Sequence, residues 1–279
     1  MMKKIKIITD STSDLRKEEI EKYGVEVVYL TAIIDGVEYR EIDNTEYIHK
    51  LRTAKDFSTS QPAVGQFIEA YEKWTKEGYD IISIHLTPAV SGTYSTAVSV
   101  ANDFENVRVV DTTTSSRGMI YFIKEAYEYI QEGKSLDEIY DLLQAKREKI
   151  ITYVSIDKLD NLVKGGRLKK SAGFIGGLLN LKVLTKVTEN DELVPVDKVR
   201  GKKKLVQALI DNLKKDLVGK EIKTVSLVHS LSDEYVELMS SALKEAFGYE
   251  MKQEDIGIVT AVISTHVGEG AVGILIETK

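Results

Sequence analysis

The feature that most constrains the fold is an alternation of short apolar runs with amphipathic segments of helical period. The runs at 80–86 (DIISIHL) and 107–111 (VRVVD) are apolar almost throughout, which is typical of parallel strands buried on both faces. Helical periodicity follows in segments beginning at Ser115 and Ser135, and the second opens with a capping box of Ser135 and Glu138. This alternation predicts a mostly parallel sheet flanked by helices.

The pattern changes near residues 150–152. A glycine-punctuated apolar segment occupies 159–188. Beyond it, periodicity predicts helices at 203–217 and 234–247 and strands at 224–229, 257–265 and 271–277. We therefore predict an N-terminal α/β domain over 1–151 and a C-terminal α/β domain over 152–279.

Composition and missing motifs exclude several classes of function. The chain has no cysteine, which excludes disulfides and thiol catalysis and is expected of a cytoplasmic protein. A net charge of −6 provides no global basic field for nucleic acid. The apolar run near the N-terminus is short and interrupted by lysine, so we expect a strand rather than a signal peptide. No P-loop, G-x-G-x-x-G or H-E-x-x-H pattern occurs, so neither a nucleotide cofactor nor a metal is expected.

Hydroxyl side chains collect where strands end or helices begin, at 9–14, 58–62, 91–96 and 111–116. Ligands of open α/β sheets bind at the carboxyl ends of strands, and helix N-termini favour anions. Serine and threonine are also ordinary N-caps, so each segment has a purely structural interpretation. The strongest candidate for an anion site is Ser91-Gly92-Thr93, because one cap needs one hydroxyl and glycine lets a ligand approach the backbone.

Two histidines receive different interpretations. His266 lies at the end of a predicted strand, before a glycine turn, and is a candidate donor to an anion. The alternative for His266 is an ordinary loop histidine. His85, inside the predicted strand before Ser91, is expected to be packed in the core.

Several motifs in a fixed order resemble the DegV family of bacterial fatty-acid-binding proteins, along the whole chain. They are ITDSTSDL, STSQPAVGQF, VSGTYSTA, VVDTTTSSRG, YVSIDKLDNLVKGGRLKK, VRGKKK and STHVGEGAVG. The resemblance implies a two-domain α/β structure with a fatty acid in the crevice between the domains. It also implies a role as acyl carrier for a separate fatty acid kinase, which phosphorylates the bound carboxylate.

The resemblance assigns roles to particular residues. The carboxylate-contacting threonine of T-S-Q-P corresponds to Thr59, followed by Ser60, and the serine of S-G-T corresponds to Ser91. The late histidine corresponds to His266. The kinase-docking arginines of G-G-R and V-R-G correspond to Arg167 and Arg200. The expected ligand-binding set is Thr59, Ser60, Ser91, Gly92, Thr93, His266, Phe174, Ile175 and Leu178, and the expected partner-binding set is Arg167, Arg200 and Lys202.

The apolar members of that set come from 171–187, which could line the tunnel that a fatty acid tail needs. A core helix with glycines at close contacts is the alternative. Three positions depart from the family pattern: Ala63 after S-Q-P, the TPAV turn before Ser91, and Glu269 in the glycine turn. Glu269 adds a negative charge near His266, but no departure removes Thr59, Ser91 or His266.

The leading hypothesis is therefore a non-enzymatic carrier of a long-chain fatty acid such as palmitate, stearate or oleate. The rival is a serine acyl hydrolase with Ser91 as nucleophile and His266 as base, although no G-x-S-x-G elbow occurs. A regulatory lipid sensor is not separable from a carrier by sequence. The basic runs at 164–170 and 198–204 could face an acidic partner protein or, transiently, an anionic membrane surface. Chain-length preference and oligomeric state are left open.

Overall fold

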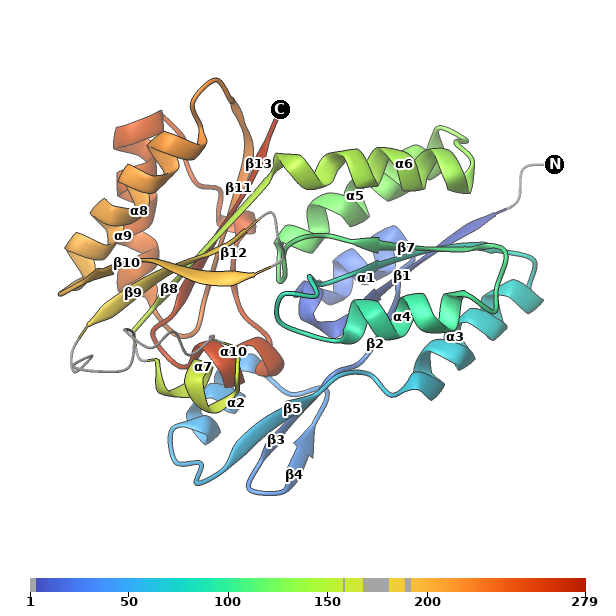
Figure 1. Ribbon diagram of the computed structural model, residues 1–279, viewed down its shortest axis with the longest axis horizontal. Helices are drawn as coiled ribbons and strands as arrows, with labels where there is room; N and C mark the ends of the chain where they lie inside the picture. The colour runs from blue at the N-terminus through green and yellow to red at the C-terminus, as the bar shows by residue number, and fades with distance from the viewer. Residues whose placement is uncertain (1–3, 158, 168–180, 189–191) are drawn as a thin grey trace. The chain divides into compact units, whose positions relative to one another are not determined.

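The structure is a computed structural model that describes residues 4–157, 159–167, 181–188 and 192–279. The chain forms two compact units (Figure 1). Unit 1 comprises Met1–Thr31 and Ser60–Ile150, and unit 2 comprises Ala32–Thr59 and Ile151–Lys279.

Residues 32–59 belong to unit 2, whereas the predicted division at residue 151 placed them in the N-terminal domain. Its physical reason is a set of contacts with a distant part of the chain. Tyr47 is fully buried, and its hydroxyl lies 2.6 Å from Oγ1 of Thr265. A domain boundary predicted from a change in sequence pattern cannot take account of contacts between segments so far apart in the chain.

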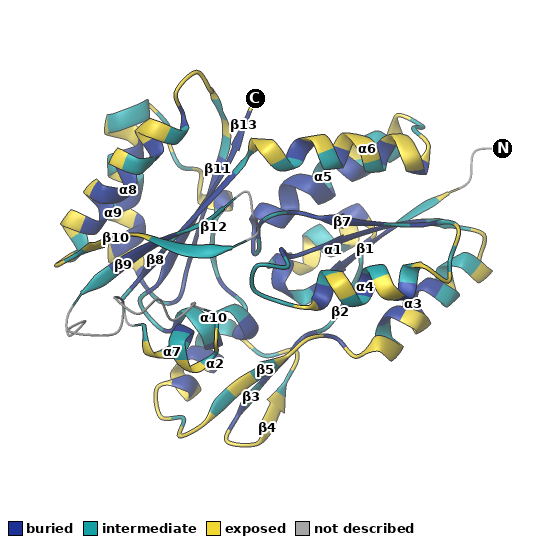
Figure 2. Ribbon diagram, in the orientation of Figure 1, coloured by how far each residue is buried: buried dark blue, intermediate teal, exposed yellow. Residues whose placement is uncertain are grey.

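Unit 1 contains a parallel sheet, as the apolar runs predicted. Its strand order is β2-β1-β6-β7, and each neighbouring pair is parallel. The strands are β1 (Ile5–Asp10), β2 (Glu26–Val28), β6 (Asp80–His85) and β7 (Val107–Asp111). Figure 2 shows β1 and β7 mostly in the buried colour, which explains their nearly continuous apolar character.

Helices cover the sheet of unit 1. They are α1 (Lys17–Tyr23), α3 (Val64–Lys76), α4 (Thr93–Ala101), α5 (Gly118–Gln131) and α6 (Leu136–Lys146), with 3-10 turns at Ser11–Ser13 and Arg147–Lys149. Helices α3 and α4 share one core cluster with the sheet, including Phe67, Ile81 and Ala97. The predicted capping box is present at the start of α6, where Ser135 accepts from the backbone N–H of Glu138.

Unit 2 contains a mixed sheet in the order β10-β9-β8-β13-β11-β12 and a small sheet in the order β4-β3-β5. The strands are β3 (Thr31–Ile34), β4 (Val37–Tyr39), β5 (Phe57–Ser60), β8 (Ile150–Ile156), β9 (Lys182–Val187), β10 (Leu193–Val199), β11 (Ile222–His229), β12 (Ile256–Ile258) and β13 (Val272–Thr278). The helices are α2 (Asn44–Leu51), α7 (Asp160–Lys164), α8 (Lys202–Asp216), α9 (Asp233–Phe247) and α10 (Ala261–Val267), with a 3-10 turn at Gln253–Asp255. No helix within the described ranges has the length and apolarity needed to cross a membrane.

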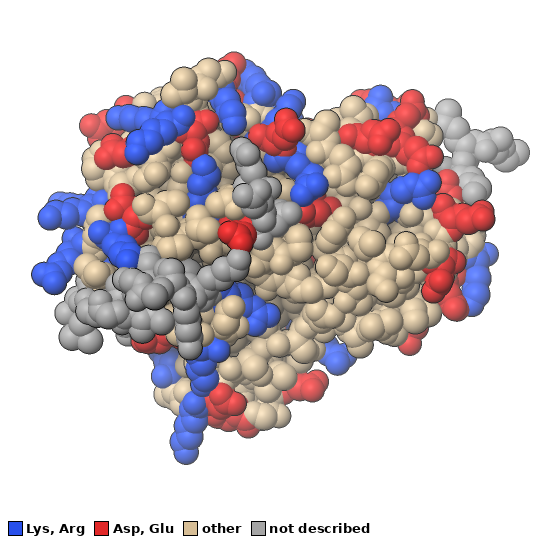
Figure 3. All heavy atoms as spheres, viewed as in Figure 1, with Lys and Arg blue, Asp and Glu red and all other residues tan. Residues whose placement is uncertain are grey.

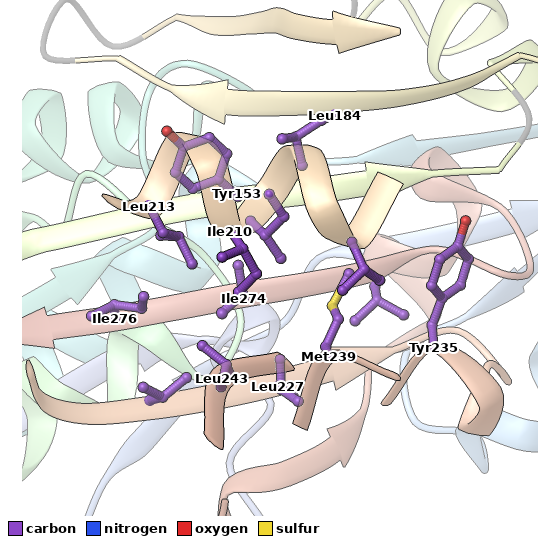
Figure 4. Close-up of a cluster of buried hydrophobic side chains, with 14 of the residues drawn as sticks. Tyr153, Leu184, Ile210, Leu213, Leu227, Tyr235, Met239, Leu243, Ile274 and Ile276 are labelled. Carbon is purple, nitrogen blue, oxygen red and sulfur yellow. The ribbon is translucent and has the colours of Figure 1, made fainter. Parts of the chain in front are cut away.

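The core of unit 2 lies between its larger sheet and the helices α8 and α9. Figure 4 shows Leu213 of α8 and Leu243 of α9 in one cluster with Leu227 and Ile274 of the sheet. Each of these four side chains is at most 1% exposed, so their packing holds the two helices against the sheet. The two predicted amphipathic helices are thus confirmed as packing elements.

One predicted strand is wrong. Residues 257–265 were expected to form a single strand, but β12 ends at Ile258 and the helix α10 begins at Ala261. The β-branched residues of this segment have strand propensity, which tertiary contacts readily override. Here the helix buries Val262 and Thr265, and the Thr265 hydroxyl contacts Tyr47 of α2.

Candidate functional site

A threonine–histidine pair lies at the meeting point of β5 and α10 in unit 2. Thr59 stands one residue before the end of β5, and His266 lies in the last turn of α10. Oγ1 of Thr59 is 2.7 Å from Nε2 of His266, and both residues are half-buried. The structure thus brings together two of the predicted site residues, which are 207 positions apart in sequence.

The imidazole of His266 is neutral near pH 7. Burial, followed by the positive charge of Arg167, lowers the pKa of His266 to about 4. Nδ1 is closed off from solvent and has no hydrogen-bond partner in the described part of the chain. In the tautomer with its hydrogen on Nε2, the ring donates to Thr59, and the Thr59 hydroxyl can donate onward to an anion.

The lowered pKa of His266 predicts a pH-dependent stability. Between the usual pKa of 6.5 and about 4, the unfolded chain binds a proton on this ring and the folded chain does not. The free energy of unfolding therefore falls as the pH falls through this window, by about 1.4 kcal/mol per pH unit for one group. Above the window the ring is neutral in both states and contributes no slope.

The matched control for this pH dependence is His266→Asn. It removes the contribution of His266 and keeps that of His229, whose pKa is also lowered by burial. Urea unfolding of both proteins between about pH 4.5 and 7 measures the difference. Identical pH dependence in the two proteins would contradict the assignment.

Helix α7 and its neighbours support the pair within unit 2. Asn161 donates through Nδ2 to the carbonyl of Thr265 at 3.0 Å, so α7 is joined to α10. Lys164 lies 2.9 Å from Asp56 and over the ring of Phe57, so α7 is also joined to β5. Sequence reasoning missed Asn161, and no local pattern in the sequence distinguishes it.

The acidic departure Glu269 is neutralised locally. Its two carboxylate oxygens accept from Nε and Nη2 of Arg52, each at 2.6 Å. The negative charge expected near His266 is therefore paired with a cation from α2. Because the two side chains are 46% and 37% exposed, we attribute little stability to this pair.

The Ser-Gly-Thr segment opens α4 in unit 1. Ser91 is half-buried, accepts from the N–H of Thr93 at 3.3 Å, and has its Oγ 2.8 Å from Oγ1 of Thr93. The N-cap position itself is Gly92, so Ser91 does not cap the helix but satisfies the backbone N–H of its first residue. Gly92 is exposed, and a Cβ there would meet the amide end of the Gln61 side chain, which is itself exposed.

A chain of buried hydrogen bonds joins β6 to its neighbours through Ser83 and His85. Tyr71 donates to Ser83, Ser83 lies 2.7 Å from Nε2 of His85, and Nδ1 of His85 lies 2.9 Å from Asp10. His85 is completely buried, which confirms the prediction of a packed core histidine. The order resembles a Ser-His-Asp triad, but Ser83 is also completely buried and out of reach of a substrate.

Other predicted residues are placed as follows. Ser60 ends β5 and is exposed. Arg167 is half-buried, and its Nη1 donates to the carbonyl of Gly165 at 2.7 Å. Arg200 is exposed, and Lys202 at the start of α8 forms an ion pair with Glu234. The apolar residues predicted for the tunnel, Phe174, Ile175 and Leu178, lie outside the described residues, as do Lys169 and Lys170.

Metal binding receives no support from the described ranges. They contain no group of three His, Cys, Asp or Glu side chains arranged to hold a metal ion.

Comparison with known proteins gives a consistent result. The profile of a family described as "Uncharacterised protein, DegV family" matches residues 4–279. A DegV domain-containing protein of Staphylococcus aureus (strain COL) is 38% identical over 277 residues, covering 98% of each chain. A DegV family protein from Thermus thermophilus, described by its fatty acid binding, is 30% identical, with a TM-score of 0.87 over 99% of this chain and 100% of the other. A fatty-acid-binding DegV family protein from Streptococcus agalactiae is 29% identical, with a TM-score of 0.88 over 99% of each chain.

Proposed function

The chain belongs to the DegV family, and from this premise we propose that it is a carrier of a long-chain fatty acid. The carboxylate is held by Thr59 and His266, with Ser91 as a further donor. The observation that carries the proposal is the Thr59–His266 hydrogen bond, in a chain that resembles fatty-acid-binding proteins over nearly its whole length.

The two ends of a fatty acid would contribute differently to binding. A tail of about 15 methylenes, at roughly 0.8 kcal/mol each, gives on the order of 12 kcal/mol of gross burial. A charge-assisted hydrogen bond adds about 1.5–3 kcal/mol, and loss of free motion offsets much of the total. The tail therefore dominates affinity, and the polar residues determine where the head group lies.

Mass spectrometry of the purified protein tests the proposal. The protein is measured first under native conditions and then after denaturation. We expect the native mass to exceed the chain mass by that of a fatty acid, which denaturation releases. A protein that neither co-purifies with a fatty acid nor takes up added palmitate would overturn the proposal.

We further propose that the protein presents the bound fatty acid to a separate fatty acid kinase. Helix α8 begins with Lys202, Lys203 and Lys204 and has no acidic residue in its first turn. Lys202 is paired with Glu234, but the exposed charges of Lys203 and Lys204 oppose the helix dipole, so an acidic partner surface would relieve an unfavourable arrangement. Figure 3 shows lysine and arginine atoms projecting from the unit that carries α8. Formation of an acyl phosphate on addition of a fatty acid kinase and ATP tests this part.

Replacing Ser91 with alanine is expected to weaken binding of palmitate by about ten-fold or more, because one donor to the carboxylate is lost. The exposed Ser99 of the same helix gives a matched control, and Ser99→Ala should leave affinity within about two-fold. Calorimetric titration measures both, and thermal unfolding checks that the Ser91 variant is folded. Normal affinity in the Ser91 variant would remove this residue from the site.

The rival hypothesis of a serine acyl hydrolase with Ser91 and His266 has less support. The Ser91 hydroxyl is hydrogen-bonded to the Thr93 side chain and accepts from the backbone N–H of Thr93, so it has a structural role. Labelling of Ser91 by a serine-directed covalent probe would favour the hydrolase, and absence of labelling together with a releasable fatty acid would favour the carrier.

A further inference from the structure

We propose that Gly165 is a positioning residue for the carboxylate site, because the absence of a side chain there seats the imidazole of His266 against Thr59. The proposal rests on the proposed function in one respect: it takes Thr59 and His266 as the pair that holds the head group.

Gly165 is required for space and not for backbone conformation. Its φ and ψ of −73° and −9° are right-handed helical values, which any residue adopts. A Cβ at this position would nevertheless collide with Nδ1 of His266, and it would lie 3.0 Å from Cε1 of the same ring and 3.0 Å from the carbonyl oxygen of Asn161. The neighbouring Gly166 is the opposite case, because its φ is +72° and a Cβ there would have nothing within 4 Å.

The imidazole of His266 has little space to move away from a methyl group at position 165. On its far side Nε2 is held by Thr59 at 2.7 Å. The backbone that carries the ring is joined to α7, because Asn161 donates to the carbonyl of Thr265. Gly165 is joined to the same helix, because its N–H donates to the carbonyl of Asn161 at 2.8 Å.

A methyl group therefore has to be accommodated by rotation of the imidazole or by separation of α7 from α10. Rotation breaks the bond between His266 and Thr59 directly. Separation breaks the Asn161–Thr265 bond, which helps to hold α10 in place. In both cases the hydroxyl of Thr59 loses the partner that orients it toward a carboxylate.

The test is Gly165→Ala, with Gly166→Ala as the matched control. For Gly165→Ala we expect palmitate affinity to fall at least about ten-fold and the imidazole ¹⁵N chemical shifts of His266 to change in the ligand-free protein. For Gly166→Ala we expect a lower melting temperature, from strain at positive φ, with His266 shifts unchanged and affinity within about two-fold. Unchanged affinity and shifts in Gly165→Ala would overturn the proposal.

A double-mutant cycle separates an effect through the ring from a general disturbance of α7. In a His266→Ala background there is no imidazole to displace, so adding Gly165→Ala should change affinity by no more than about two-fold. A second loss as large as in the wild-type background would overturn the proposal. If Gly165→Ala alone does not fold, recovery of folding in the double variant supports the clash, and failure of the double variant overturns it.

The failure of this inference is distinguishable from failure of the proposed function. A wild-type protein that binds no fatty acid overturns the carrier proposal. In that case the His266 chemical shifts of the wild type and of Gly165→Ala still show whether a side chain at position 165 displaces the imidazole. A wild-type protein that binds palmitate, with a Gly165→Ala variant that binds equally well, overturns only the role of Gly165.

Discussion

Replacing Thr59 with valine is expected to weaken fatty acid binding by about a hundred-fold, the largest binding effect of a single substitution in the proposed site. Valine keeps the shape of the side chain and removes the hydroxyl. The carboxylate loses a charge-assisted hydrogen bond of about 1.5–3 kcal/mol. His266 also loses the partner of its Nε2, and its Nδ1 is already unpartnered in the described part of the chain.

Thr59→Ser is the control, because it retains the hydroxyl and should bind palmitate within a few-fold of the wild type. Calorimetric titration gives the affinities, and the His266 ¹⁵N shifts report whether the ring has changed its environment. A valine variant that binds as tightly as the serine variant would show that the hydroxyl takes no part in holding the head group.

Replacing Asp10 with alanine is expected to lower the free energy of unfolding of unit 1 by about 3–5 kcal/mol, the largest stability effect that we predict. Asp10 is completely buried and accepts from the N–H groups of Thr12 and Leu86 and from the hydroxyl of Thr12. It also lies 2.9 Å from Nδ1 of His85. Alanine leaves these donors buried without their acceptor, and the ends of β1 and β6 lose one of the interactions that join them.

Two further variants show whether the loss of stability in Asp10→Ala comes from the lost buried acceptor. Asp10→Asn keeps one carbonyl acceptor and should be less destabilised than Asp10→Ala. Asp137→Ala removes an exposed carboxylate paired with Arg108 and should change the free energy of unfolding by less than about 0.5 kcal/mol. Chemical denaturation followed by probes in each unit gives the values. A loss below about 1 kcal/mol for Asp10→Ala would contradict the structural role assigned to this carboxylate.

Predictions that depended on local physics were confirmed. The strands β6 and β7 were recognisable because strands buried on both faces need apolar residues almost throughout. The capping box of α6 was recognisable because both partners lie within one helical turn. His85 was correctly predicted to lie in the core because it falls within such a strand.

Predictions that depended on distant contacts were less accurate. The segment that ends with Thr265 was predicted as a strand from its β-branched residues, whereas its contact with Tyr47 stabilises a helix. Nothing near Gly165 in the sequence indicates that it faces an imidazole a hundred residues further along.

Sequence alone was sufficient for the fold class, the parallel sheet of unit 1 and the family, because periodicity, capping and ordered motifs are encoded in short stretches of the chain. Only the tertiary structure decided that Thr59 and His266 share a hydrogen bond, and that Gly165, directly after α7, lies against the opposite edge of the ring. The physical reason is that a site of this kind depends on angstrom-scale packing between elements far apart in the chain, for which a linear sequence contains no local signal.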